Sequence, residues 1–457
     1  MLFRSEGDQE AFIEDVIAKE QHLGFDLEND SLLRAQLIRI ADGKFIFLYS
    51  MHHIITDGWS SRIFIYQLTQ LYLSLKQRLS NPFQPQRIQY KDYSEWQHQF
   101  LNGARGKEQE KFWRETLKGE IPVLNLPTTH PRPSVKTNNG NIYNYEFPGQ
   151  LLADVNAYAN SASVSRFVMI VSIINVLLNK YTGQSDIIVG TTVSGRDHEQ
   201  LENQLGCFLN TLAIRNQIDS GNTFEQHLRG VGTSVLESLD HQHYPFDLVI
   251  EQLKVKNDPG RSPLFDVLIE YHNFNHVSID RIAGESEGTA SVTPYAYEKN
   301  TSQLDLTFSF VQDHERSLKL NLIYNTDLFD EAYIERLTLH LEALCQQVVN
   351  NPALSLSDYD ILLDQERELI NEFNQTARVI PEGTVIDQIA RITRQFPDKI
   401  AIQMNEISLT YRELSQNASQ LANLLLQQGL QKGDTVVYLG ERGPEMLEGL
   451  LGIFMAG

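Results

Sequence analysis

The sequence predicts a mixed α/β protein with more than one domain. The chain has 457 residues, which is too long for one ordinary hydrophobic core, so two or three domains are expected. Strand patterns and helix patterns occur together along its whole length. A stretch rich in proline and threonine at residues 125–134 reads as a connection between two lobes, and the pattern changes again near residue 384.

The first region predicts a strand followed by a helix. Residues 44–51 form an apolar, aromatic run of strand length. After Asp57 and Gly58, apolar residues recur at the spacing of an amphipathic helix. These residues are Phe64, Leu68, Leu71, Tyr72 and Leu75.

The middle region predicts long helices next to strands. Residues 165–181 form an apolar helix pattern that leads into a strand at residues 186–189. Asp330 is a good N-cap for a helix over residues 331–349, and Pro352 follows the end of that helix.

The last region has a different character. Residues 361–383 are expected to be a linker with one short helix. Thr384 can cap a helix that runs to Phe396. Residues 411–428 are amphipathic, and residues 435–439 are expected to form an apolar strand. This order of helix, strands, helix, strand and helix is typical of the beginning of an α/β domain.

Composition excludes several classes of function. The formal net charge is −21 at pH 7, which disfavours nucleic acid and anionic membranes as partners, since both require basic surfaces. Apolar residues make up 41% of the chain, as in folded soluble proteins. The N-terminus has no apolar signal region, and no run reaches transmembrane length, so the chain is expected to be cytoplasmic.

The two cysteines, Cys207 and Cys345, are too few and too far apart for a disulfide framework or a thiolate metal cluster. Cys345 lies on the apolar face of its predicted helix and is expected to be part of the core.

The strongest candidate for chemistry is a pair of histidines at the predicted strand end. His52 and His53 alternate in direction, so one can face a cavity while the other packs. Gly58 is expected to allow a tight turn after Asp57. A neutral imidazole is well suited to accept a proton near neutral pH. A structural role is the alternative, and no third ligand at metal-binding spacing supports a metal.

Further motifs accompany this pair. The segment at residues 52–58 reads His-His-Ile-Ile-Thr-Asp-Gly, and it resembles the His-His-x-x-x-Asp-Gly motif of the condensation domains of nonribosomal peptide synthetases. Four later segments resemble further motifs of that family, in the family's order. They are residues 90–96, 205–211, 241–247 and 261–265.

The resemblance implies a fold and a reaction. The fold would be two lobes like chloramphenicol acetyltransferase, set in a V, followed by an incomplete α/β adenylation domain. Carrier domains upstream and downstream would present substrates on phosphopantetheine arms, and the acceptor amine would attack the donor thioester. His53 would be catalytic, either as a base or as a hydrogen-bond donor. No metal, nucleic acid or membrane is implied, and no cofactor bound covalently to this chain.

The resemblance also implies supporting roles. His52 and Gly58 would support the motif, and Asp57 would be structural, paired with an arginine. Arg196 is the expected partner from the second lobe, and Arg261 is the second candidate. Most of the later motifs are expected to be architectural, with Trp96 and Phe208 as packing residues. His241 and His243 are expected to cap or hydrogen-bond locally, and Asn210 either lines the cleft or closes a turn.

The resemblance sets expected domain boundaries. Residues 1–131 would be the first lobe, without its start, and residues 132–360 the second lobe. A linker over residues 361–383 would lead to the start of an adenylation domain at residues 384–457. Its ATP and magnesium site would lie beyond Gly457. We therefore expect a chain cut at both ends, with little activity of its own.

The sequence leaves other functions open. A coenzyme A acyltransferase of the same superfamily would share the histidine motif but would not continue into an adenylation domain. An epimerization domain usually ends a module, and a heterocyclization domain replaces the histidine pair. A module that only docks carriers remains the alternative from a different class. The wording of the histidine motif favours an L-configured donor.

Overall fold

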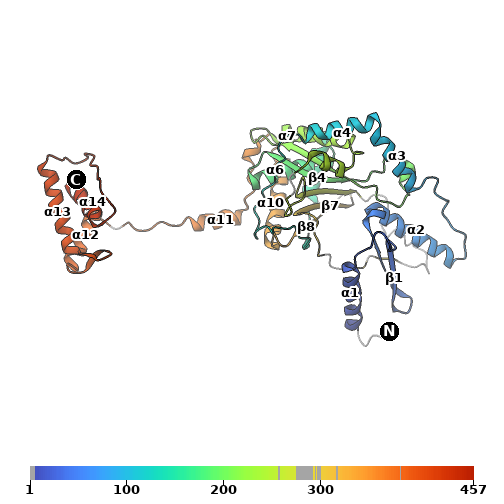
Figure 1. Ribbon diagram of the computed structural model, residues 1–457, viewed down its shortest axis with the longest axis horizontal. Helices are drawn as coiled ribbons and strands as arrows, with labels where there is room; N and C mark the ends of the chain where they lie inside the picture. The colour runs from blue at the N-terminus through green and yellow to red at the C-terminus, as the bar shows by residue number, and fades with distance from the viewer. Residues whose placement is uncertain are drawn as a thin grey trace. The chain divides into compact units, whose positions relative to one another are not determined.

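The computed structural model describes residues 6–255, 258–273, 292–293, 295, 300–314, 317–380 and 382–457. The chain folds into two compact units, Met1–Arg367 and Glu368–Gly457. Figure 1 shows their elements.

The first unit begins with a helix and a β-hairpin. Helix α1 (Glu6–His22) precedes strands β1 (Leu33–Ala41) and β2 (Lys44–Met51). The two strands pair antiparallel, with Leu33 opposite Met51, as a separate two-stranded sheet. The strand predicted at residues 44–51 is therefore confirmed. A short 3-10 helix, η1 (His53–Ile55), follows β2 and leads to α2 (Gly58–Lys76).

Two helices follow α2 and lead the chain toward the second half of the first unit, which begins with strand β3 (Gly140–Glu146). Helices α3 (Tyr90–Asn102) and α4 (Ala104–Thr116) join at Gly103 and pack against each other. In α4, Trp113 is buried and its Nε1 donates a hydrogen bond to the carbonyl of His241, at 3.0 Å. Helix α4 is thereby fixed to the segment that carries the 241–247 motif.

The second half of the first unit is built on a six-stranded mixed sheet. Its strand order is β3-β8-β7-β6-β4-β5. The pairs β7·β6 and β6·β4 are parallel, and the other neighbouring pairs are antiparallel. The strands are β3 (Gly140–Glu146), β4 (Asp186–Val193), β5 (Asn210–Gln217), β6 (Val267–Asn273), β7 (Leu306–His314) and β8 (Ser317–Asn325).

Helices pack against this sheet and against one another around the main core (Figure 1). Helix α6 is buried over most of its length; it is capped by Ser165 and ends at Gly183, whose φ is +68°. Asp330 caps α10, as predicted, by accepting from the backbone N–H of Tyr333 at 2.8 Å. The helices are α5 (Gly149–Ser161), α6 (Arg166–Thr182), α7 (Phe224–Asp240), α8 (Phe246–Leu253) and α10 (Glu331–Asn350), with short 3-10 helices η2 (Glu199–Leu201) and η3 (Leu356–Asp358).

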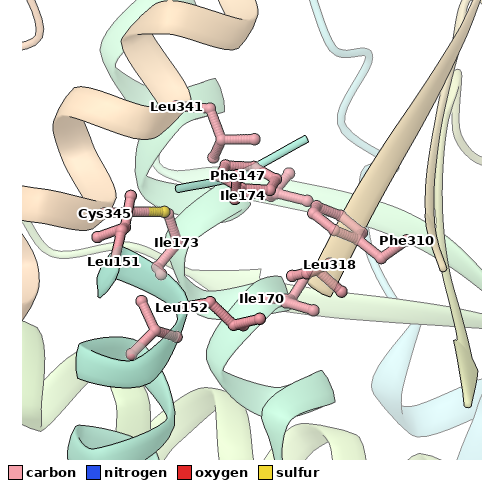
Figure 2. Close-up of a pocket in the computed structure, with 11 residues that line it drawn as sticks. Phe147, Leu151, Leu152, Ile170, Ile173, Ile174, Phe310, Leu318, Leu341 and Cys345 are labelled. Carbon is pink, nitrogen blue, oxygen red and sulfur yellow. The ribbon is translucent and has the colours of Figure 1, made fainter. Parts of the chain in front are cut away.

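The main core contains a small apolar cavity of about 40 Å³ between α5, α6, α10 and the sheet (Figure 2). Cys345, expected to be core, is buried and lines this cavity, and burial raises the pKa of its thiol to about 12. The volume holds little more than one or two methylene groups, so the cavity is a packing defect of the core. Its walls are Phe147, Leu151, Leu152, Val155, Ile170, Ile173, Ile174, Phe310, Leu318, Leu341 and Cys345.

No single described helix is long and apolar enough to cross a membrane, although the bent pair α5 and α6 passes the same test of length and composition when taken together, across a 108° bend.

The second unit begins within α11 (Asp364–Phe373), the one short helix expected between residues 361 and 383. It contains a hairpin of β9 (Ile400–Met404) and β10 (Ile407–Thr410). Thr384 caps its first helix in a reciprocal capping box with Asp387, as predicted. Its helices are α12 (Val385–Gln395), α13 (Tyr411–Gln427) and α14 (Pro444–Ala456).

The strand predicted at residues 435–439 is wrong for this structure. These residues form no ladder, and Val437 and Leu439 are 84% and 97% exposed. A strand requires a hydrogen-bonded neighbour, and the described part of this unit pairs β9 only with β10. An apolar run of strand length does not form a strand when no neighbouring strand pairs with it.

We predict that Leu152→Ala destabilises the first unit by about 3–5 kcal/mol, because it enlarges a cavity that the surrounding core has not closed. Chemical denaturation of the variant measures the loss. The control is Leu236→Ala in α7, where the side chain is 61% exposed, and a change within about 0.5 kcal/mol is expected. Equal effects of the two substitutions would contradict the assignment of the core.

Candidate functional site

The histidine pair lies where β2 ends and η1 begins. The side chain of His52 is half-buried, and its Nδ1 accepts a hydrogen bond from the backbone N–H of Ile54 at 3.1 Å. Its ring also packs edge-on against Phe25, with the centroids 5.8 Å apart. His53 is exposed. Of the two histidines, His52 is therefore the packed one and His53 the open one.

The contact of His53 is made to a distant part of the chain. Its Nδ1 lies 3.7 Å from Sγ of Cys207, which precedes β5 in the second half of the unit. His53 therefore faces the segment that contains the 205–211 motif. The predicted cleft stays a prediction.

Asp57 is the N-cap of α2 and is buried. Its Oδ1 accepts from the backbone N–H of Ser60 at 2.7 Å, and its Oδ2 accepts from the N–H of Phe208 at 3.1 Å. Both carboxylate oxygens lie 3.2 Å from Nη2 of Arg196. The predicted contact between Asp57 and Arg196 is confirmed, and the carboxylate is occupied by structural partners.

Arg196 gathers the loop before β5 around this carboxylate. Its Nη1 donates to the carbonyls of Leu201 and Gln204, at 2.6 and 2.7 Å, and its Nη2 donates to Oγ of Ser60 at 2.7 Å. The guanidinium also stacks over the ring of Phe208, 4.2 Å from its centroid. Burial lowers the pKa of Arg196, while the charge of Asp57 acts in the opposite direction.

Gly195 permits this arrangement. Its φ is +62°, and a Cβ at this position would lie 2.1 Å from the carbonyl oxygen of Phe208. Side chains rarely adopt that backbone conformation, and the close approach leaves no room for one. The loop therefore turns at Gly195 and directs the neighbouring Arg196 toward α2.

The tight turn predicted at Gly58 is wrong. Asp57 has extended backbone angles, and α2 begins directly at Gly58, which has no positive φ and would have open space around a Cβ. The change of direction occurs earlier, in η1, so the glycine is required there neither by conformation nor by packing.

Arg261, the second candidate partner of Asp57, lies in another ion pair. Its Nη1 is 2.6 Å from Oδ2 of Asp266, and it also donates to the carbonyl of Leu124 at 3.1 Å. The 261–265 motif thus ties the segment before β6 to the connection between the two halves of the unit.

The remaining motif residues are mainly structural, with two differences from expectation. Asn210 closes the loop before α8: its Nδ2 donates to the carbonyls of Gln242 and Tyr244, each at 2.8 Å. His241 hydrogen-bonds locally to the carbonyl of Glu237, but His243 pairs across the fold with Asp197 at 3.0 Å.

The second difference concerns Trp96, which was expected to be a packing residue. It is 44% exposed, stacks on Phe100 and lies nearly perpendicular to the ring of His243. Phe208, by contrast, is buried as expected. The residue type of an aromatic side chain on a helix does not show how much of that side chain other segments bury.

Sequence reasoning missed two contributors. Ser60 joins α2 to the loop, because its Oγ donates to the carbonyl of Gly206 at 2.8 Å. The sequence offered one signal for this role of Ser60, which is its position three residues after Asp57, the N-cap aspartate. The contact of Cys207 with His53 joins residues 154 positions apart, and no local pattern predicts it. No group of three or more described His, Cys, Asp or Glu residues is placed to hold a metal ion.

Comparison with known proteins identifies the family. The condensation domain family matches residues 2–371, and the AMP-binding enzyme family matches residues 389–457. The chain belongs to the condensation domain family of nonribosomal peptide synthetases, with the beginning of an AMP-binding domain after it.

Named relatives agree with this assignment. The chain is 35% identical to gramicidin S synthase 2 of Brevibacillus brevis over 435 residues, which cover 95% of this chain and 10% of that protein. It is 36% identical to tyrocidine synthase 3 of Brevibacillus parabrevis over 435 residues, which cover 95% of this chain and 6% of that protein. The chain therefore spans about a tenth or less of the length of these relatives.

Solved structures show the same fold. A four-domain nonribosomal peptide synthetase bound to AMP and glycine matches 98% of this chain and 34% of its own, with a TM-score of 0.80 and 23% identity. The first condensation domain of the calcium-dependent antibiotic synthetase matches 78% of each chain, with a TM-score of 0.60 and 15% identity. The predicted mixed α/β condensation fold is confirmed.

We predict that Asp57→Asn lowers the free energy of unfolding of the first unit by about 3–5 kcal/mol, because it leaves the Arg196 charge buried without its counter-charge. Chemical denaturation measures the loss. The control is Asp398→Asn, which removes an exposed ion pair with Arg412 and should change stability by less than about 1 kcal/mol. An Asp57→Asn protein with unchanged stability and only a defect in chemistry would refute the structural role.

Proposed function

We propose that the first unit catalyses amide-bond formation between a donor acyl or peptidyl thioester and the amine of an acceptor aminoacyl thioester. The observation that carries the proposal is the exposed His53, held on a short turn between β2 and α2, in a chain of the condensation domain family. Both substrates would arrive on the phosphopantetheine arms of carrier domains in the same synthetase.

The reaction requires a group that handles one proton. The amine nitrogen attacks the thioester carbonyl carbon, the C–S bond of the resulting tetrahedral intermediate breaks, and the proton lost by the amine goes finally to the leaving thiolate. Aminolysis of a thioester is downhill, so positioning both substrates supplies much of the acceleration. His53 either accepts the amine proton or donates a hydrogen bond that stabilises the intermediate.

Asp57 is not assigned a proton-transfer role in this proposal. Its two oxygens already accept from Ser60, Phe208 and Arg196, and it is 3% exposed. A carboxylate with these partners is not open to a substrate amine. His52 and Arg196 are likewise assigned to support of the motif that fixes His53.

The domain boundaries remain part of the proposal: first lobe to residue 131, second lobe over residues 132–360, linker over residues 361–383, and adenylation segment from residue 384. The AMP-binding match over residues 389–457 supports the last boundary. ATP and magnesium would serve amino-acid activation in a complete AMP-binding domain, and none of the residues of the histidine site is assigned to them.

Two alternatives are retained. An acyltransferase with a free coenzyme A substrate would use the same histidine, but the AMP-binding segment favours the synthetase reading. A module that docks carriers without catalysis would bind loaded carriers and form no product. Incubation with loaded donor and acceptor carriers, followed by product analysis, separates these functions.

We predict that His53→Ala decreases the rate of amide formation by about 10²–10⁴-fold, the usual contribution of a positioned proton-transfer group, without loss of stability. The rate is measured by quenched product analysis in a synthetase module that contains this chain and its carrier domains. His52→Ala is the comparison: it removes the hydrogen bond to Ile54 and should lower stability. Full activity of the His53→Ala enzyme would refute the proposed function.

A further inference from the structure

The contact between His53 and Cys207 carries an inference beyond the family assignment. Nδ1 of His53 and Sγ of Cys207 are 3.7 Å apart, which is within reach of a hydrogen bond that involves sulfur. His53 is exposed and Cys207 is half-buried. The thiol therefore stands beside the imidazole on its Nδ1 side.

The backbone around Cys207 is held on both sides. Before it, the N–H of Gly206 donates to Oγ of Ser60 at 3.1 Å. After it, the N–H of Phe208 donates to Asp57 at 3.1 Å. Oη of Tyr90 donates to the carbonyl of Cys207 itself at 2.7 Å. The groups that hold α2 to the loop thus also fix the place of the sulfur.

The thiol stays neutral in this place. Burial raises the pKa of Cys207, and the charge of Asp57 raises it further, against the opposing effect of Arg196 and a backbone hydrogen bond from Leu209. A neutral thiol can donate to or accept from an imidazole nitrogen. Because it is not a thiolate, it competes poorly as a nucleophile with the substrate amine.

We propose that Cys207 is a positioning residue for His53: its thiol holds Nδ1 and thereby leaves Nε2 as the nitrogen that faces the reacting amine. This inference rests on the proposed function of His53. Cys207 touches no reacting atom in this arrangement. It acts through the imidazole, by limiting the rotation of the ring and fixing which nitrogen is available to the substrate.

The test compares Cys207→Ala, which removes the polar contact, with Cys207→Ser, which restores a hydroxyl. In a synthetase module with its carriers, Cys207→Ala should lower kcat by about 3- to 10-fold, the value of one lost hydrogen bond, with KM for the acceptor carrier unchanged. Cys207→Ser should recover most of the rate. Cys345→Ala is the control, since Cys345 lies in the core cavity. The pH–rate profile of the Cys345→Ala enzyme should equal that of the parent enzyme.

A second readout does not depend on activity. Nitrogen NMR of the imidazole in the folded 457-residue chain reports which ring nitrogen of His53 carries the proton, and Cys207→Ala should change that tautomer preference while Cys345→Ala leaves it unchanged. An unchanged His53 tautomer preference in Cys207→Ala refutes the inference, as does an equal rate loss in the serine and alanine variants. Full activity of His53→Ala would instead refute the proposed function, and the NMR result would still decide whether the contact exists.

Discussion

The arrangement of the site depends on one buried ion pair, between Asp57 at the start of α2 and Arg196 in the loop before β5. Their side chains are almost completely buried, at 2% and 1% exposure. Burying two charges is costly unless hydrogen bonds satisfy the rest of both groups. Here Ser60 and Phe208 donate to the carboxylate, and Nη1 of Arg196 donates to Leu201 and Gln204, while its buried Nε has no hydrogen-bond partner among the described residues.

This pair connects the histidine turn to the larger half of the unit. The β1–β2 hairpin shares no sheet with the six-stranded sheet, so backbone pairing does not fix its position there. The contacts between α2 and the loop before β5 fix the position of the hairpin instead, and they place His53 beside Cys207. The site is thus a property of two distant segments, which this ion pair joins together with the hydrogen bonds of Ser60 and Phe208.

Much of the fold could be predicted because its signals are local. Asp330 and Thr384 cap helices where expected, since a cap depends on residues within one turn. The histidine motif and the Asp57–Arg196 contact followed from the family resemblance and from the need of a buried carboxylate for a cation. The proposed catalytic role of His53 remains to be measured.

The other features depend on tertiary contacts. Cys207 meets His53 only after the chain has folded, and the exposure of Trp96 depends on which segments cover α3. The apolar run at residues 435–439 has strand composition, but a strand forms only with a partner. Gly58 follows the motif pattern although neither its conformation nor its surroundings require glycine. Local sequence specifies the helices and strands better than it specifies which distant segments they contact.

The most direct test of the account is a double-mutant cycle on the pair. The free energy of unfolding and the rate of amide formation are measured for Asp57→Asn, Arg196→Met and the combined variant. The account predicts strong coupling: the combined variant should be no less stable than either single variant, because it leaves no unpaired buried charge. Additive losses, or single variants as stable and active as the parent, would contradict the claim that this pair holds the site together.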